Sequence, residues 1–240
     1  MFFSENPFYR LGVHSTDSPA ALQERERKLS GGEPEEVEAL RLLLQQETRC
    51  EAEFYWLVGW SKEEALSEAS RIIAGRVYSR EHWAELSPLS RMMIELNEMA
   101  AGHISLSRLL KIERDFEALS PLEAAEDIQR DRRTAGVPLI KEPWIIEMWK
   151  QDLLSEIGRA ASLASSQMKI EDYGGLLHEL GEKGRRGMVY FQLLSDYEKR
   201  NTERLHAASL SAKEKGKRNF AAWLLWGLLA FVLLLGWLVQ

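Results

Sequence analysis

Apolar residues recur at helical spacing along most of the chain, between residues that typically cap helices. Val37, Leu40 and Leu44 form such a stripe, and Ser61 with Glu64 has the spacing of a capping box. Other helix boundaries are indicated by serine-proline pairs, a proline and glycines: Ser18-Pro19, Ser87-Pro88, Ser120-Pro121, Pro143, Gly59 and Gly136. The one strand candidate, residues 137–140, is too short to build a sheet. The pattern predicts an all-α protein.

The first predicted domain covers residues 1–60. Two helices, 19–30 and 34–58, are joined by a short polar loop, and each carries an apolar stripe. Such a pair is expected to pack as an antiparallel hairpin, with Phe8 and Leu11 covering one end.

The remaining chain divides at its glycines and at its last charge. We predict a helical domain over residues 61–173, a glycine-rich break and basic helical stalk over 174–218, and a transmembrane segment over 219–240. The break is predicted from the five glycines between residues 174 and 187.

The segment 220–239, FAAWLLWGLLAFVLLLGWLV, is 20 residues long and carries no charge. As a helix it would be about 30 Å long, which is about the hydrocarbon thickness of a bilayer. Trp223 and Trp226 lie near one end and Trp237 near the other, as expected of side chains at the two membrane interfaces. The alternative is a buried core helix, which is seldom so uniformly apolar.

Basic residues directly precede this segment and predict its orientation. They are Lys213, Lys215, Lys217 and Arg218. Positive charge stays on the cytoplasmic side, so we expect a single-pass, tail-anchored protein with a cytoplasmic N-terminus and its C-terminus on the far side. The same four residues are candidates for binding anionic lipid headgroups. The N-terminal residues do not resemble a signal peptide.

Net charge narrows the classes of partner. The 240 residues carry a formal charge of −6, although seven basic and only two acidic residues lie between Lys199 and Arg218. The body before Lys199 is therefore strongly acidic, which argues against nucleic-acid binding. A single cysteine, Cys50, agrees with a reducing compartment.

No residue constellation indicates an enzyme, a metal site or a cofactor. The five histidines lack the i, i+4 pairing of a zinc site, and Cys50 is expected to pack in the hairpin. Asp127 and Asp131 lie among arginines, which favours ion pairing over a shared cation. The loop GEKGRRG, residues 181–187, is interpreted as a hinge, with anion binding as the alternative.

An aromatic-rich helix follows Pro143. Trp144 and Trp149 are candidate partner-binding residues, with core packing as the alternative. The cluster of Met92, Met93 and Met99 is expected in the core.

The opening NPFYRLGV, with the two helices that follow it and the aromatic patch Phe54, Tyr55 and Trp56, resembles a J-domain, the DnaJ-type co-chaperone module. It is closest to the degenerate bacterial J-like modules that begin Asn-Pro-Phe, and the match covers about 55 residues. The resemblance implies a J-like fold and a protein partner, with a DnaK-type chaperone as the first candidate. An ordinary helical hairpin is the alternative.

The loop between the two helices departs from the family. J-domains carry His-Pro-Asp there, whereas residues 30–34 of this chain read SGGEP. The family's basic face is represented only by Arg25, Arg27 and Lys28, which alternate with Glu24 and Glu26 and remain candidate partner-binding residues. Stimulation of a DnaK-type ATPase is therefore not implied.

Two functions remain open at this point. The first is a tail-anchored interaction protein whose cytosolic J-like body recruits a protein partner to the membrane. The alternative is a self-associating membrane effector or scaffold with a regulatory helical body, although Gly227 and Gly236 are too far apart for a Gly-xxx-Gly dimer motif.

Overall fold

The computed structural model describes residues 1–28, 33–79, 81–140, 143–166, 168–183 and 187–211, and the described residues contain helices and no strand, which confirms the all-α class. The helices, including two short 3-10 turns, are η1 (Phe3–Glu5), α1 (Pro7–Leu11), α2 (Pro19–Lys28), α3 (Pro34–Leu44), α4 (Gln46–Phe54), α5 (Lys62–Ile73), η2 (Trp83–Glu85), α6 (Pro88–Ala100), α7 (Leu106–Ala118), α8 (Pro121–Ala135), α9 (Pro143–Ser165) and α10 (Ile170–Glu182). Residues 188–211 are also helical.

The chain forms two units, Met1–Asp196 and Tyr197–Gln240. The first unit includes the segments 1–60 and 61–173, which are predicted above as separate domains. They belong to one unit because side chains of the first segment pair with side chains of α8 in its interior, as described below. Of the second unit, the structure describes only the helical residues 197–211.

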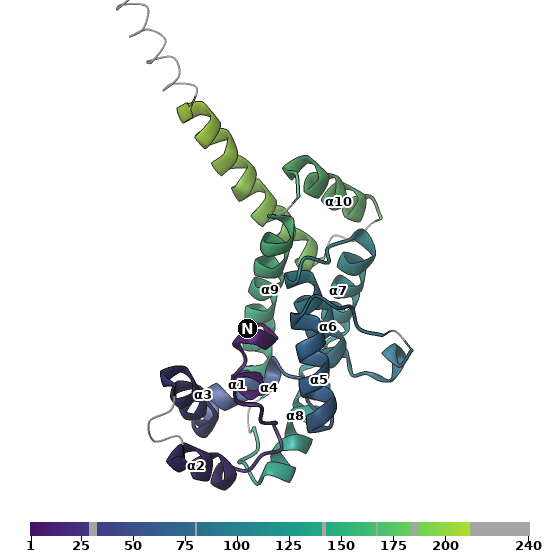
Figure 1. Ribbon diagram of the computed structural model, residues 1–240. Helices are drawn as coiled ribbons and strands as arrows, with labels where there is room; N and C mark the ends of the chain where they lie inside the picture. Colours follow the sequence, from purple (N-terminus) through teal and green to yellow (C-terminus); the bar gives the residue numbers. More distant parts are fainter. Residues whose placement is uncertain (29–32, 80, 141–142, 167, 184–186, 212–240) are drawn as a thin grey trace, which may run out of the picture. The chain divides into compact units, whose positions relative to one another are not determined.

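Helix α6 is the centre of the first unit. It packs against α5, α7 and α9, and it lies between α9 and α7 in Figure 1. Nearly the whole circumference of α6 is buried as a result, and Met92, Met93 and Met99 are fully buried, as predicted. Cys50 is also buried, and burial raises the pKa of its thiol to about 12, which agrees with a packing role.

Helix starts follow the capping residues of the sequence. Ser61 and Glu64 form the predicted capping box of α5, and the hydroxyls of Ser87 and Ser120 accept hydrogen bonds from the first turns of α6 and α8. Gly136 ends α8 at φ +67°, a left-handed conformation that favours glycine.

The NPFYRLGV segment forms the short helix α1, capped at both ends. Asn6 accepts the Phe8 amide proton, and its side-chain amide donates to the carbonyls of Ala52 (2.9 Å) and Tyr55 (3.1 Å) at the end of α4. Gly12 closes α1 at φ +60°. The segment therefore fixes α1 to the end of α4, while α1 and α2 both pack against α3 (Figure 1).

The long helix predicted over residues 34–58 is wrong in two places. The backbone leaves helical geometry at Gln45, with ψ 131°, and the hydroxyl of Thr48 donates to the Leu42 carbonyl (2.5 Å). This bond replaces a helical amide donor at the break, and α4 begins at Gln46. It ends at Phe54, and residues 55–58 are buried without continuing the helix.

The flexible break predicted over residues 174–187 is also wrong for most of its length. Helix α10 runs through Gly174, Gly175 and Gly181, and its buried residues Tyr173, Leu177 and Leu180 share one face. Packing of this face against α7 outweighs the low helix propensity of glycine. The predicted boundary between residues 173 and 174 therefore falls inside a helix.

Among the helices that the structure describes, none is both long enough and apolar enough to cross a membrane. The predicted span 220–239 lies outside the described residues.

Candidate partner-binding surface

Helix α9 places its two tryptophans in different environments. Trp149 is 9% exposed, and its ring centroid lies 5.5 Å from that of Phe54 on α4. Trp149 is therefore a core residue, and its candidacy as a partner-binding residue is not supported. The alternative of core packing holds for this tryptophan, because its side of α9 packs inside the first unit.

Trp144 instead lies on the surface, together with Met148. Trp144 is 57% exposed and Met148 is 58% exposed, and residues four apart lie on one face of a helix. We call these two side chains the α9 patch. An exposed tryptophan beside an exposed methionine is typical of protein-binding surfaces, where large apolar side chains supply most of the binding energy.

The basic residues of α2 are largely compensated by a neighbouring acid. Arg27 and Lys28 both lie 3.4 Å from carboxylate oxygens of Glu24, and Arg25 is half-buried. Exposed ion pairs of this kind contribute little, and here they reduce the positive field of the helix. Residues 29–32, which include most of the loop that lacks His-Pro-Asp, lie outside the described residues.

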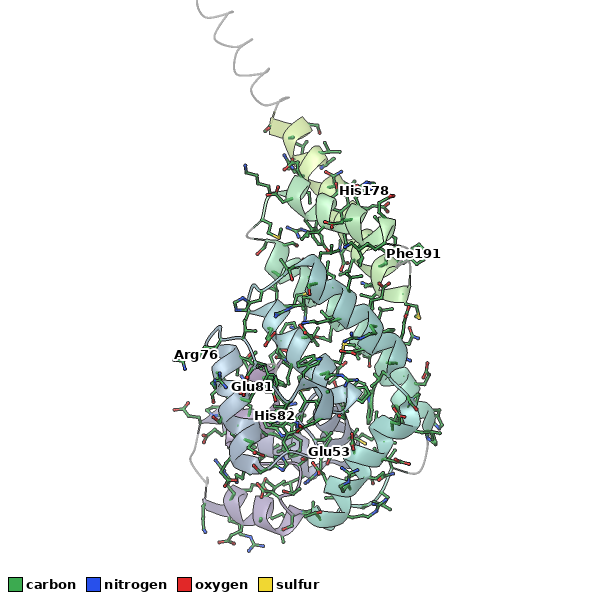
Figure 2. The ribbon with its side chains drawn as sticks, turned by 90° about the vertical axis from the view of Figure 1, so that its right-hand side faces the viewer. Glu53, Arg76, Glu81, His82, His178 and Phe191 are labelled. Carbon is green, nitrogen blue, oxygen red and sulfur yellow. The ribbon has the colours of Figure 1, made fainter. Side chains whose placement is uncertain are left out.

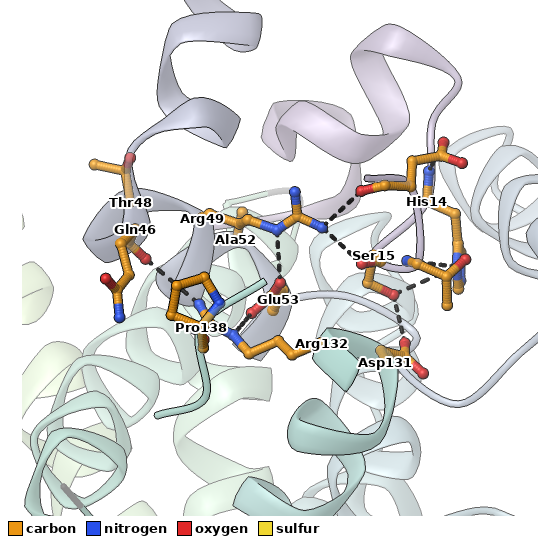
Figure 3. A network of polar contacts seen from close by, with 12 residues as sticks. His14, Ser15, Gln46, Thr48, Arg49, Ala52, Glu53, Asp131, Arg132 and Pro138 are labelled. Carbon is orange, nitrogen blue, oxygen red and sulfur yellow. Dashed lines mark hydrogen bonds and ion pairs between the residues drawn. The ribbon is translucent and has the colours of Figure 1, made fainter. Parts of the chain in front are cut away.

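A buried ion network fixes the N-terminal helices to α8, and it was missed by the sequence analysis. Glu53 on α4 accepts from Arg49 Nε (2.9 Å) and from Arg132 Nε (2.5 Å), and all three side chains are at most 1% exposed (Figure 3). Arg49 also donates to the carbonyl oxygens of Ser15 and Asp17. The only sequence signal is the i, i+4 spacing of Arg49 and Glu53, which occurs on many exposed helices.

Beside this network lies a Ser-His-Asp grouping that resembles catalytic machinery. Ser15 donates to Asp131 (2.5 Å) and lies 3.4 Å from His14 Nδ1, while Asp131 also accepts from the Gly59 amide (Figure 3). Ser15 is 0% exposed and His14 is 1% exposed, so no substrate reaches either one. Burial lowers the pKa of His14, which favours a neutral imidazole. The grouping is therefore structural.

Ion pairing is observed for one of the two aspartates flagged in the sequence. Asp127 lies 3.2 Å from Arg130. Within the described ranges, no group of three or more histidine, cysteine or acidic residues is arranged to hold a metal ion.

The predicted membrane-related residues lie outside the described residues. They are Lys213, Lys215, Lys217, Arg218, Trp223, Trp226 and Trp237. Residues 184–186, most of the basic part of the GEKGRRG loop, also lie outside them.

No protein-family model matches the chain, and neither a curated protein nor a solved structure is similar to it. The α9 patch is therefore interpreted from its own exposure and chemistry.

Proposed function

We propose that this chain is a membrane-anchored protein-interaction protein. Residues 220–239 cross the bilayer, the helical body stays on the cytoplasmic side, and the body recruits a protein partner to the membrane. The NPFYRLGV segment makes a DnaK-type chaperone, or a relative, the first candidate. Because the His-Pro-Asp tripeptide is missing, binding is not expected to stimulate the ATPase of that partner.

The observation that carries the proposal is the α9 patch. Trp144 and Met148 remain exposed although Ile146 and Trp149, on the same two turns, are buried in the core. Because each of these side chains is a little over half exposed, it forfeits roughly half of the 1.5–3 kcal/mol that full burial of a large apolar side chain contributes. A protein surface that covers them recovers this free energy.

Binding is tested with the full chain in detergent micelles and a purified DnaK-type chaperone, by biolayer interferometry. The double variant Trp144→Ala/Met148→Ala is expected to weaken binding by about tenfold or more. Leu163→Ala is the matched control, because Leu163 is 47% exposed on the same helix and lies outside the patch. Equal binding by both variants, or no binding by the wild-type chain, would contradict the proposed partner.

The membrane part of the proposal is tested separately by flotation with phosphatidylcholine–phosphatidylglycerol liposomes. The full chain is expected to float, and Leu228→Lys/Leu233→Lys is expected to remain in the dense fraction, since each central lysine opposes insertion by about 3 kcal/mol. Cross-linked dimers that disappear in the α9 patch variant would instead assign the patch to self-association.

A further inference from the structure

A surface groove of about 680 Å³ lies beside α5, and it is separate from the α9 patch. Its lining comes from the turn before α5, from α5, from the segment between α5 and α6, from α6 and from α8. The residues that matter below are Trp60, Glu64, Glu68, Tyr78, Glu85 and Asp127.

Two aromatic rings form part of the wall of the groove. The ring centroids of Trp60 and Tyr78 are 6.0 Å apart with an interplanar angle of 63°, and both side chains are half-buried. Trp60 Nε1 donates to the hydroxyl of Ser90 on α6 (3.3 Å), which holds the indole in place. The faces of such rings attract cations through their quadrupoles.

Carboxylates supply most of the charge around the groove. Glu64, Glu68, Glu85 and Asp127 line it, whereas Arg130 is the only lysine or arginine among the lining residues that the structure describes. Arg130 is already engaged by Asp127 at 3.2 Å. His82, labelled in Figure 2, lies at the groove and contacts Glu85 at 3.3 Å. The remaining charge of the lining is negative and favours a positively charged ligand.

One of these carboxylates, that of Glu68, is buried, and one of its two oxygens lacks a hydrogen-bond donor among the described residues. The Glu68 side chain is 9% exposed, and its Oε2 accepts from Arg71 Nη1 (2.8 Å). Its Oε1 is buried without a hydrogen-bond partner among the described residues. Burial raises the pKa of Glu68, and Arg71 only partly opposes this. A second cation at the groove would stabilise the ionised carboxylate.

We propose that the Trp60–Glu68 groove binds an organic cation, that is, an alkylammonium or guanidinium group. The aromatic walls favour an organic cation over a hydrated metal ion, because a metal ion requires several converging oxygen ligands. Two kinds of molecule carry such a cationic group. One is a protein segment with a lysine or arginine side chain, and the other is a free amine such as putrescine or agmatine. The proposal does not depend on the membrane anchor or on a chaperone partner.

The test uses the full chain in detergent micelles and isothermal titration calorimetry. The probes are the pentapeptide Gly-Gly-Lys-Gly-Gly with blocked ends, the same peptide with Nε-acetyl-lysine, putrescine and agmatine. The lysine peptide is expected to bind at least tenfold more tightly than its neutral acetylated form. Tighter binding of the lysine peptide than of either amine identifies a protein side chain as the source, and the reverse order identifies a free amine.

Variants separate a specific site from general attraction by an acidic body. Glu68→Gln and Trp60→Leu are each expected to weaken binding of the best probe about fivefold or more. Glu63→Gln is the matched control, because Glu63 is an exposed carboxylate on the same helix outside the groove lining. It is expected to leave affinity within a factor of two.

A further variant, at an exposed residue of the groove, tests binding without the risk of misfolding. Glu85 has a side chain that is 74% exposed, so Glu85→Gln cannot disturb the core, and it is expected to weaken binding about twofold. Equal affinity for the charged and acetylated peptides would overturn the proposal. Equal losses in Glu63→Gln and Glu68→Gln, or no loss in Glu68→Gln, would overturn it as well.

Discussion

Glu53 and Glu68 are two buried glutamates of the first unit, and the residues around them compensate their charges to different extents. Glu53 is 0% exposed and both of its carboxylate oxygens accept from arginines, Arg49 and Arg132. Glu68 is 9% exposed, and within the described part of the chain only one of its oxygens has a hydrogen-bond partner, Arg71. Burial raises the pKa of both carboxyls, and arginine neighbours oppose it in both cases. The difference therefore lies in how completely each charge is compensated.

How completely the charge of each glutamate is compensated depends on which segments of the chain its arginine partners join. The two arginines on Glu53 extend to backbone carbonyls of distant segments, since Arg49 also donates to Ser15 (2.7 Å) and Arg132 to Gln46 (3.4 Å). Among the described residues, Glu68 pairs only with Arg71, three residues along its own helix. A carboxylate that joins separate segments is structural, whereas one that is bonded locally beside a groove retains capacity for a ligand.

The largest expected effect comes from removing one partner of Glu53. Arg132→Ala leaves a buried carboxylate with one guanidinium, and it is expected to reduce the free energy of unfolding by about 3–5 kcal/mol. Chemical denaturation of the full chain in micelles, followed by near-ultraviolet circular dichroism, measures the change. Arg133→Ala, at the exposed neighbouring position, is the control and is expected to change stability by less than about 0.5 kcal/mol. A loss below 1 kcal/mol for Arg132→Ala would show that Glu53 is not held as the distances indicate.

The local features of the fold were predictable, and the long-range ones were not. Ser61, Ser87 and Gly136 act within their own turns, so their capping roles follow from sequence spacing. The bond from Arg132 to Glu53 joins residues 79 apart, and no local pattern specifies which arginine reaches which acid. The break at Gln45 was missed for a related reason, because nothing in an apolar helical stripe signals an interruption.

In the candidate sites, too, local features are predictable from the sequence and long-range features are not. Exposure of Trp144 and burial of Trp149 depend on which face of α9 packs against α6 and α8, so the sequence alone leaves both as candidates. The groove at Trp60 combines residues from five segments, and no local sequence pattern indicates that its carboxylates come together. The prediction of a flexible break at the α10 glycines is wrong because the apolar face of Tyr173 and Leu177 packs against α7.

A smaller effect of opposite sign is expected at the second glutamate. Glu68→Gln removes a buried charge that is only half compensated, so at pH 7.5 it is expected to raise the Tm by about 1–3 °C. Because the folded-state pKa of Glu68 is raised, its destabilisation is present above the folded pKa and disappears below the ordinary value of 4.5. The gain should therefore vanish when Tm is measured at pH 4. A loss of several degrees at pH 7.5 would mean that Glu68 is as structural as Glu53.

The smallest effect is expected at an exposed carboxylate, where pairing outweighs desolvation. Glu5 accepts two hydrogen bonds from Arg159, at 2.8 and 2.7 Å, and this pairing lowers the pKa of Glu5 to about 2. The stabilisation is present above the ordinary value of 4.5 and is lost as the pH falls toward 2. Both side chains are over 40% exposed, so Glu5→Gln should reduce the free energy of unfolding at pH 7 by only about 0.5 kcal/mol. The difference between Glu5→Gln and wild type should shrink steadily between pH 5 and pH 2.5.

Glu35→Gln is the matched control for this last prediction. Glu35 pairs with Arg10 through a single contact of 3.0 Å, and its side chain is 76% exposed. Water screens such a pair almost completely, so its removal should change stability less than removal of the two-bond pair at Glu5. Equal effects of the two variants would mean that exposure alone sets the value of a carboxylate pair in this protein. A larger effect at Glu5 would allow the three glutamates to be ranked by what decides their contribution to stability. At the exposed Glu5 it is pairing with an arginine, and at Glu68 it is burial. Only Glu53 combines full burial with full compensation.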